Sequence, residues 1–180
     1  MSEQMKSVIR NFIVKLDYIM GIIDKITGVA IVGFLFASFL LLFLQVILRH
    51  VVFYPLVWLE ELAIYLLAYL AFWGSSSCFR KDTHIRVRFI RNYFPPLIRQ
   101  LMTVLANFIV VVFAYFLVRY GLPLAQLGIG ERSGSGNFLL YWPRMALVTG
   151  GILILLQVVN QLIMEIAKLF LNIQLDSVNR

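Results

Sequence analysis

The sequence predicts an all-α integral membrane protein with four transmembrane helices and additional interfacial amphipathic helices. Of its 180 residues, 61% are hydrophobic and only 14% are charged, whereas a soluble domain carries roughly 25% charged residues. A chain of this size has too little interior to hide so much apolar surface from water. Four long stretches contain no Asp, Glu, Lys or Arg. Because backbone groups in lipid must be hydrogen-bonded within their own segment, these stretches are expected to be helices.

The four uncharged stretches are each long enough to cross a bilayer. They contain 18 to 23 residues, so as helices they measure about 27–35 Å, close to the roughly 30 Å of the hydrocarbon layer. They also lack the alternation of β-barrel strands. We therefore expect transmembrane helices over residues 26–48, 62–79, 100–118 and 145–164.

Residues 8–23 are predicted to form an amphipathic helix that lies flat in the membrane interface. The charged residues Arg10, Lys15 and Asp17 argue against a span, while apolar residues recur at helical spacing and form one stripe. The stripe consists of Ile9, Phe12, Ile13, Leu16, Ile19, Met20 and Ile23. The alternative is a short helix packed on a partner protein.

The connection over residues 80–96 is also amphipathic, because basic and apolar residues interleave before Pro95 and Pro96 end the segment. Basic groups at this position can meet anionic lipid headgroups. The residues expected to do so are Arg80, Lys81, Arg86, Arg88 and Arg91. Basic patches with aromatic residues can also bind nucleic acid, but we do not expect this for a stretch held at a membrane.

The connection over residues 119–144 is expected to be a flexible, Gly-rich exposed loop. Gly121 and Pro123, followed by four further glycines, are expected to break any regular element. Tyr141 and Trp142 mark the return of the chain to the membrane interface.

The basic residues predict the orientation. The formal net charge is +7, and 12 of the 16 Lys and Arg residues fall in the N-terminal segment, in the connection between the second and third spans, or in the C-terminal segment. Because such residues concentrate on the cytoplasmic side, both termini are expected in the cytoplasm and the 119–144 loop in the periplasm.

No catalytic set, metal site or cofactor site is expected. The four uncharged stretches contain no acid, Lys, Arg or His, and their mild polar residues are typical of hydrogen bonds between helices. His50 and His84 fall at opposite ends of the second span, so they cannot share one haem. Cys78 is the only cysteine. Small residues four apart favour close helix approach, and these are Gly33 with Ala37, Ala71 with Ser75, and Ala146 with Gly150.

Trp58, Glu60 and Glu61 stand at the outer start of the second span. Two interpretations are open for the carboxylates. Both are solvated and stabilise the positive end of the helix, or one of them faces an Arg or Lys of a partner. Consecutive helical residues point about 100° apart, so the two carboxylates cannot have the same role.

Several motifs in this order resemble the small membrane subunit (DctQ-type) of tripartite ATP-independent periplasmic (TRAP) transporters. They are Trp58-Leu59-Glu60-Glu61, Gly74, His84-Ile85-Arg86-Val87, Phe94-Pro95, and Tyr141-Trp142-Pro143 leading to Gly150-Gly151. Arg88 departs from the family, which often has an acid soon after this Val. The resemblance implies a subunit of a sodium-driven secondary importer of organic acids, such as C4-dicarboxylates or sialic acid, in the bacterial inner membrane.

The resemblance also implies partners. A periplasmic substrate-binding protein would capture the solute, and a large multi-span subunit would carry it by an elevator-type motion and provide the sodium coupling. This chain would then be an accessory scaffold, with Trp58, Glu60 and Glu61 at the contact with the large subunit and the Gly-rich loop touching the binding protein. The alternatives are a stand-alone four-helix transporter, which usually needs an acid within the membrane, and the membrane anchor of a redox complex.

Overall fold

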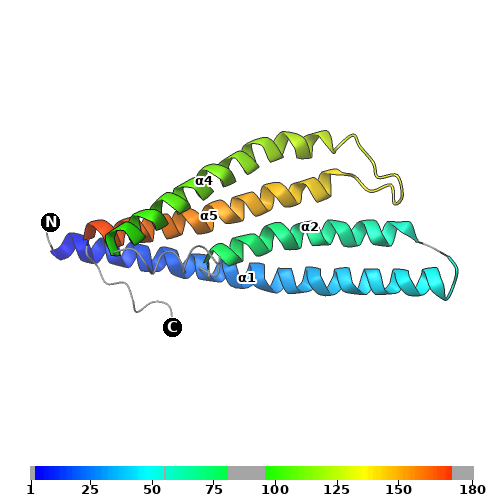
Figure 1. Ribbon diagram of the computed structural model, residues 1–180, viewed down its shortest axis with the longest axis horizontal. Helices are drawn as coiled ribbons and strands as arrows, with labels where there is room; N and C mark the ends of the chain where they lie inside the picture. Colours follow the sequence, from blue (N-terminus) through cyan, green and yellow to red (C-terminus); the bar gives the residue numbers. More distant parts are fainter. Residues whose placement is uncertain (1–2, 55, 81–95, 172–180) are drawn as a thin grey trace.

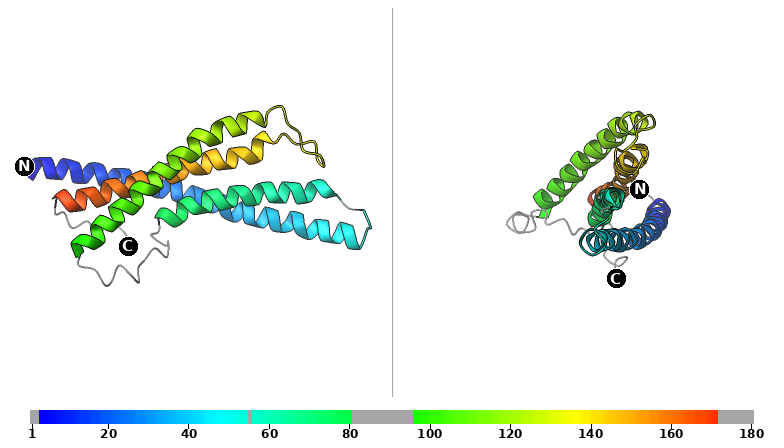
Figure 2. Two further views of the ribbon diagram at one scale, coloured as in Figure 1. Left: turned by 45° about the horizontal axis from the view of Figure 1, so that its top comes forward. Right: turned by 90° about the vertical axis from the view of Figure 1, so that its right-hand side faces the viewer.

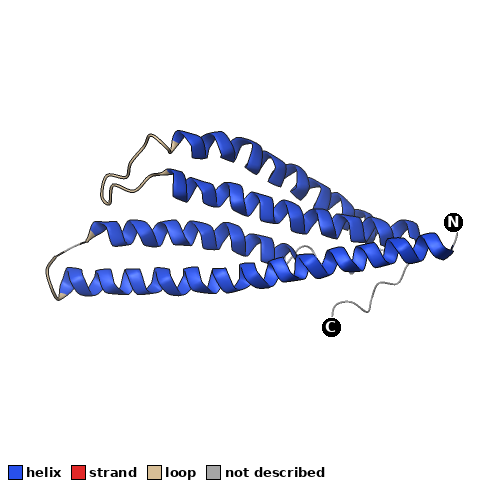
Figure 3. Ribbon diagram, turned by 180° about the vertical axis from the view of Figure 1, so that it is seen from behind, coloured by secondary structure: helices blue, strands red, loops and turns tan. Residues whose placement is uncertain are grey.

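The computed structural model describes residues 3–54, 56–80 and 96–171, and this part of the chain is built from four helices (Figure 1). The helices are α1 (Glu3–His50), α2 (Val57–Arg80), α4 (Pro96–Leu127) and α5 (Tyr141–Leu171). Each contains a stretch that is long and apolar enough to cross a membrane. Figure 3 shows no strand among the described residues. The predicted all-α fold with four transmembrane helices is therefore confirmed.

The helices form an open row. α1 packs on α2, α2 on α5 and α5 on α4, while the N-terminal half of α1 also crosses α5. The end-on view of Figure 2 places α1 and α4 on opposite sides of α2 and α5. The molecule thus consists of an α1–α2 hairpin and an α4–α5 hairpin that meet along α2 and α5. The end that holds both hairpin connections is called the outer end, because the basic residues predict that it faces the periplasm, and the opposite end is called the inner end.

α1 differs from the sequence prediction because it runs without interruption from Glu3 to His50. The predicted separation of an interfacial helix over 8–23 from a first span over 26–48 is wrong. No proline interrupts this stretch, and Asp17 is buried against the other helices instead of facing water. A helix of 48 residues is about 72 Å long, so a large part of α1 must lie outside a hydrocarbon layer of roughly 30 Å.

α4 also extends further than predicted, through Gly121 and Pro123 to Leu127. The prediction that the exposed loop begins at 119 is therefore wrong. Packing on α5 explains the difference, because a Cβ at Gly121 would lie 3.0 Å from the Leu147 side chain and Ala125 is buried. This packing outweighs the amide hydrogen bond that Pro123 cannot donate. The connection to α5 is shortened to residues 128–140.

Glycines set how closely the helices approach in the middle of the row. A Cβ at Gly150 would lie 3.1 Å from the backbone carbonyl carbon of Phe72 in α2, and a Cβ at Gly151 would lie 3.0 Å from Val118 in α4. Consecutive glycines therefore let α5 approach both neighbours. The predicted close approach at Ala146 and Gly150 is confirmed. The predicted close approach at Gly33 is wrong, because no neighbouring atom lies within 4 Å of a Cβ built there.

The core between α4 and α5 is small, and most large apolar side chains face outward. Ala114, Ile154 and Val158 form the buried cluster. By contrast, Val29 is 76% exposed and Phe113 is 58% exposed. Such exposure over whole helices marks surfaces that lie against lipid or another membrane protein.

Candidate functional site

The polar side chains gather mainly in two clusters, one at each end of the row. The outer cluster comprises Gln45, Glu60, Glu61, Tyr65, Ser133 and Ser135. The inner cluster comprises Asp17, Asp24, Ser77, Arg80, Gln157, Asn160 and Gln161. Members of each cluster come from different helices or from the connection over 128–140, so the clusters connect the elements of the row.

In the outer cluster, Glu60 connects α2 to α1. Nε2 of Gln45 donates a hydrogen bond to Oε2 of Glu60 at 2.9 Å, and the Gln45 side chain is buried. Glu60 also stands in the first turn of α2, where a carboxylate stabilises the positive end of the helix dipole. Glu60 is therefore bound within its own hairpin.

Glu61 instead binds the connection between α4 and α5. Its carboxylate accepts hydrogen bonds from the hydroxyls of Tyr65 and Ser135. Nearby, the Trp58 and Phe138 rings have centroids 6.4 Å apart. The two consecutive glutamates thus have different roles, as their angular separation on a helix requires.

The connection over 128–140 is folded into a turn. The amide of Ser133 donates to the Phe138 carbonyl at 2.8 Å, and the amide of Leu140 donates to the Glu131 carbonyl at 3.1 Å. Asn137 has φ 56°, a left-handed conformation that Asn tolerates better than most residues. The Arg144 guanidinium binds the Glu131 carboxylate and the Leu124 carbonyl, which closes the outer end of the α4–α5 hairpin.

The three residues predicted to contact a partner subunit therefore also contact their own chain. Trp58 keeps 36% of its surface exposed and Glu60 is exposed, so both remain accessible at the outer end. The interpretation that both carboxylates are merely solvated does not describe the structure. A contact with another subunit stays a prediction.

In the inner cluster, Arg80 at the end of α2 points into the row. Its Nη2 lies 3.1 Å from Oδ1 of Asp17 and 3.2 Å from the Asp17 carbonyl oxygen, and its Nη1 lies 3.4 Å from Oε1 of Gln157. The Arg80 and Asp17 side chains are only 18% and 11% exposed. The prediction that Arg80 contacts lipid headgroups is thus replaced by an ion pair within the chain. Lys81, Arg86, Arg88 and Arg91 lie outside the described residues, and their predicted headgroup contact is untested.

Three residues of α5 complete the inner cluster. Gln157 donates to the Met20 carbonyl at 3.3 Å, and Asn160 donates to Oδ1 of Asp17 at 3.3 Å. The Gln161 amide donates to the carbonyls of Phe79 and Arg80, the last two residues of α2. α5 therefore fixes both the N-terminal half of α1 and the end of α2.

Sequence reasoning missed the inner cluster because Asp17 and Asp24 lie before the first uncharged stretch. Two spacings could have revealed it. Asp17 and Asp24 are seven residues apart and therefore share a helix face. Gln157, Asn160 and Gln161 follow the i, i+3, i+4 pattern that places polar groups together on one face.

The spacing between the clusters matches the thickness of a membrane. The Ser77 hydroxyl donates to Asp24 at 2.7 Å at the inner end, while Gln45 bonds Glu60 at the outer end. Asp24 and Gln45 are 21 residues apart on α1, which is about 32 Å. Between the two clusters, Ser38 donates within α1 to the Phe34 carbonyl at 2.7 Å, and Trp73 of α2 donates to Thr149 of α5 at 3.0 Å.

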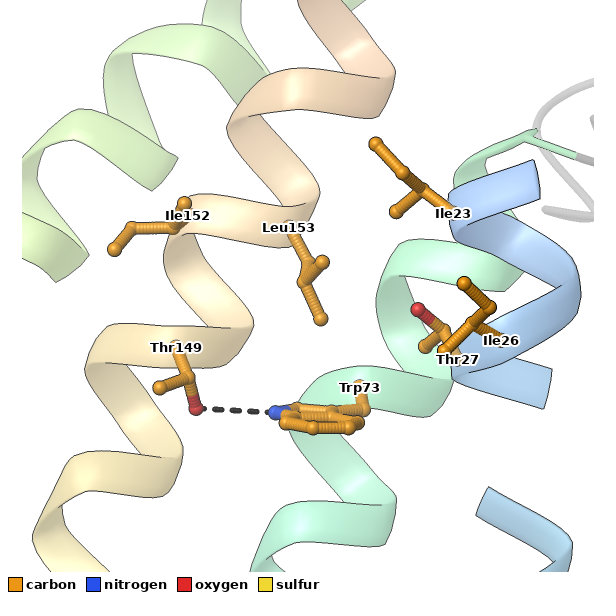
Figure 4. Close-up of a pocket in the computed structure, with 7 residues that line it drawn as sticks. All are labelled: Ile23, Ile26, Thr27, Trp73, Thr149, Ile152 and Leu153. Atoms are coloured by element: carbon orange, nitrogen blue, oxygen red, sulfur yellow. Dashed lines mark hydrogen bonds between the residues drawn. The ribbon is translucent and has the colours of Figure 1, made fainter. Parts of the chain in front are cut away.

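An apolar groove lies between α1, α2 and α5, halfway along the row (Figure 4). Its volume is about 370 Å³, and its seven lining residues carry no charge. The Trp73 indole lies across one side of the groove and donates to the Thr149 hydroxyl at 3.0 Å. A solute carboxylate would find no cation here, so the groove suits hydrocarbon.

Comparisons with known proteins identify a family. The family model described as "Tripartite ATP-independent periplasmic transporters, DctQ component" matches residues 38–168. The chain is also similar to the sialic acid TRAP transporter permease protein SiaT of Haemophilus influenzae (strain 86-028NP), with 34% identity over 86 residues. That alignment covers 48% of this chain and 14% of the relative. The chain thus matches only a small part of that permease's length.

Proposed function

The chain belongs to the DctQ component family of TRAP transporters as a small permease subunit, and from this premise we propose that it is an accessory scaffold. In this proposal it braces a large elevator-type subunit in the bilayer and does not carry solute itself. An elevator requires one part that stays fixed in the membrane while another part moves. A multi-pass helical protein with a wide apolar surface is suited to be the fixed part.

The observation that carries the proposal is the pairing of the polar groups. The Asp17 and Arg80 charges neutralise each other, and the Glu60 and Glu61 carboxylates are hydrogen-bonded to neighbouring elements. The groove in the middle of the row has an uncharged lining. A transporter that works alone usually places ionisable groups along a path through the membrane. This arrangement favours a supporting role over transport by the chain alone.

We assign the chemistry of transport to the other subunits. The solute is an organic acid, such as sialic acid or a C4-dicarboxylate, and uptake is driven by sodium bound on the large subunit. The sialic acid assignment of SiaT motivates the first choice of solute. A periplasmic binding protein delivers the solute near the outer end, where residues 128–140 form a turn fixed by Glu61. Both termini face the cytoplasm of a cell with an inner membrane.

The large subunit is expected to cover one of the exposed apolar faces at the ends of the row. Phe39 on α1 is 61% exposed and Phe113 on α4 is 58% exposed. Trp58, Glu60 and Glu61 contribute at the outer edge of the contact, while lipid headgroups meet Lys81, Arg86, Arg88 and Arg91. A charge reversal at Glu60 together with Glu61 tests the first part of this assignment.

Reconstituted vesicles test the proposed division of labour. Vesicles are prepared with this chain alone, with the large subunit alone and with both, and the binding protein is added with radiolabelled solute under an inward sodium gradient. We expect sodium-dependent accumulation with both subunits and none with this chain alone. Sodium-driven accumulation by the chain alone would favour a stand-alone transporter, and full activity of the large subunit alone would remove the bracing role.

A further inference from the structure

The two hairpins are joined most densely at the inner end. In the middle of the row, one side-chain hydrogen bond runs between Trp73 and Thr149. At the outer end, Tyr69 donates to the Trp142 carbonyl at 2.7 Å, and Ser135 donates to the Glu61 carboxylate. At the inner end, by contrast, α1, α2 and α5 converge on one ion pair, that of Asp17 and Arg80.

Asp17 is the centre of these contacts. Its Oδ1 lies 3.1 Å from Nη2 of Arg80 and accepts a hydrogen bond from Nδ2 of Asn160 at 3.3 Å. Its backbone carbonyl accepts a second hydrogen bond from Nη2 of Arg80 at 3.2 Å. One residue of α1 therefore holds the last residue of α2 and the middle of α5. Asp17 itself is buried, with 7% of its surface exposed.

We propose that Asp17 is a positioning residue that holds Arg80 inward and so makes α1, the end of α2 and α5 move as one body. This assembly of Asp17, Arg80, Gln157 and Asn160 is called the inner lock. The lock itself concerns the chain alone. Its consequence for uptake rests on the proposed function, because a brace transmits force only if its two hairpins keep a fixed relative position.

The alternative position of Arg80 explains why a charge is needed. An arginine at the end of a membrane helix normally extends its long side chain to water and headgroups. Here three acceptors turn the guanidinium inward instead: the Asp17 carboxylate, the Asp17 carbonyl and the Gln157 amide oxygen. Without the charge of the Asp17 carboxylate, only neutral acceptors hold the Arg80 guanidinium inward against its hydration. The Arg80 side chain then extends to water, and Gln157 loses a hydrogen-bond partner.

Beside the lock, a further residue of α5 holds the last turn of α2. Gln161 donates to the Phe79 and Arg80 carbonyls at the end of α2. As long as α1 and α5 hold Arg80, the last turn of α2 keeps a set position relative to α5.

The test uses the purified full-length chain and a double-mutant cycle. The variants are Asp17→Asn, Arg80→Gln and both together, with Lys15→Gln as a matched control because Lys15 is exposed and lies two residues from Asp17. We expect each single lock variant to lower the unfolding midpoint by about 5–10 °C. The double variant should match the larger single effect within about 2 °C, and the control should stay at the native midpoint.

Additive single effects, or single effects no larger than that of the control, would overturn the lock. If Asp17→Asn yields no folded protein, Arg80→Lys replaces it, because lysine keeps the charge but loses the planar fork. Unfolding midpoints equal to that of the native chain in both Arg80→Lys and Arg80→Gln would also overturn the lock.

A second measurement separates the lock from the proposed function. In vesicles with the large subunit, Asp17→Asn is expected to lower the maximal uptake rate several-fold while the half-saturating solute concentration stays unchanged. Non-additive unfolding without any association with a large subunit would leave the lock valid and defeat the proposed function. Normal association and uptake with additive unfolding effects would defeat the lock alone.

Discussion

Gly150 of α5 lies directly against the backbone of Phe72 in α2, with no space for a side chain between them. This contact sets the distance between the two hairpins halfway along the row. Membrane helices have no hydrophobic driving force toward each other, so close van der Waals contact at small residues is a main source of their association.

Replacing Gly150 by Ala is therefore expected to destabilise the chain, although alanine favours a helix by about 1 kcal/mol over glycine. The added methyl group must push α2 away, and overpacking of this kind costs about 1–3 kcal/mol. Gly28→Ala is the control, because no atom lies within 4 Å of a Cβ built there. Thermal unfolding in detergent should give a lower midpoint for Gly150→Ala and an equal or higher one for Gly28→Ala. The reverse order would show that the hairpins do not approach at Gly150.

Glu61→Ala is expected to release the turn over 128–140, because the Ser135 hydroxyl loses its acceptor on α2. The release is measured by limited trypsin digestion, as the rate of cleavage after Arg132, which is exposed within the turn. We expect cleavage there to accelerate several-fold. Glu60→Ala is the matched control, since Glu60 bonds Gln45 and not the turn. Equal cleavage rates in the two variants would argue against separate roles for the two glutamates.

Charge reversal of both glutamates, Glu60→Lys with Glu61→Lys, addresses the predicted contact with the large subunit. We expect this variant to lose most of its co-purification with that subunit. The single Glu61→Ala variant distinguishes a direct contact from a mere release of the turn. If the double reversal assembles and transports like the native chain, the assignment of these residues to the contact is wrong.

The Trp73–Thr149 hydrogen bond is expected to contribute less than the glycine contact. Hydrogen bonds between membrane helices contribute about 0.6 kcal/mol on average. Thr149→Val keeps the shape of the side chain and removes the acceptor of the Trp73 indole. Its unfolding midpoint should fall by less than that of Gly150→Ala. A larger loss would mean that polar contacts, and not close packing, hold the middle of the row together.

Composition and uncharged length predicted four membrane helices because the bilayer imposes both properties directly on the sequence. The extents of the helices depend on packing and were less accessible. Pro123 normally ends a helix, yet α4 continues because Gly121 fits against Leu147. Likewise, the charges of residues 8–23 predicted a surface helix. The ion pair that allows Asp17 to be buried is formed with Arg80, 63 residues away, and local sequence does not reveal it.

The candidate site was predictable only at its outer end. Trp58, Glu60 and Glu61 were predicted to contact a partner because they stand at the outer start of the second span, where the two carboxylates point about 100° apart. Their partners, Gln45 and Ser135, lie in a predicted span and in a predicted loop, and only the tertiary fold brings them close. Arg80 was assigned to headgroups because a basic residue after a span normally faces them.

Affinity purification of this chain from its native membranes tests the central claim most directly. The solubilised material is separated by size and identified by mass spectrometry, with a tagged unrelated membrane protein as control. The account predicts a stable complex with one large multi-span TRAP subunit in a fixed ratio. Recovery of the chain without that subunit, as a species that by itself accumulates solute along a sodium gradient in vesicles, would contradict it.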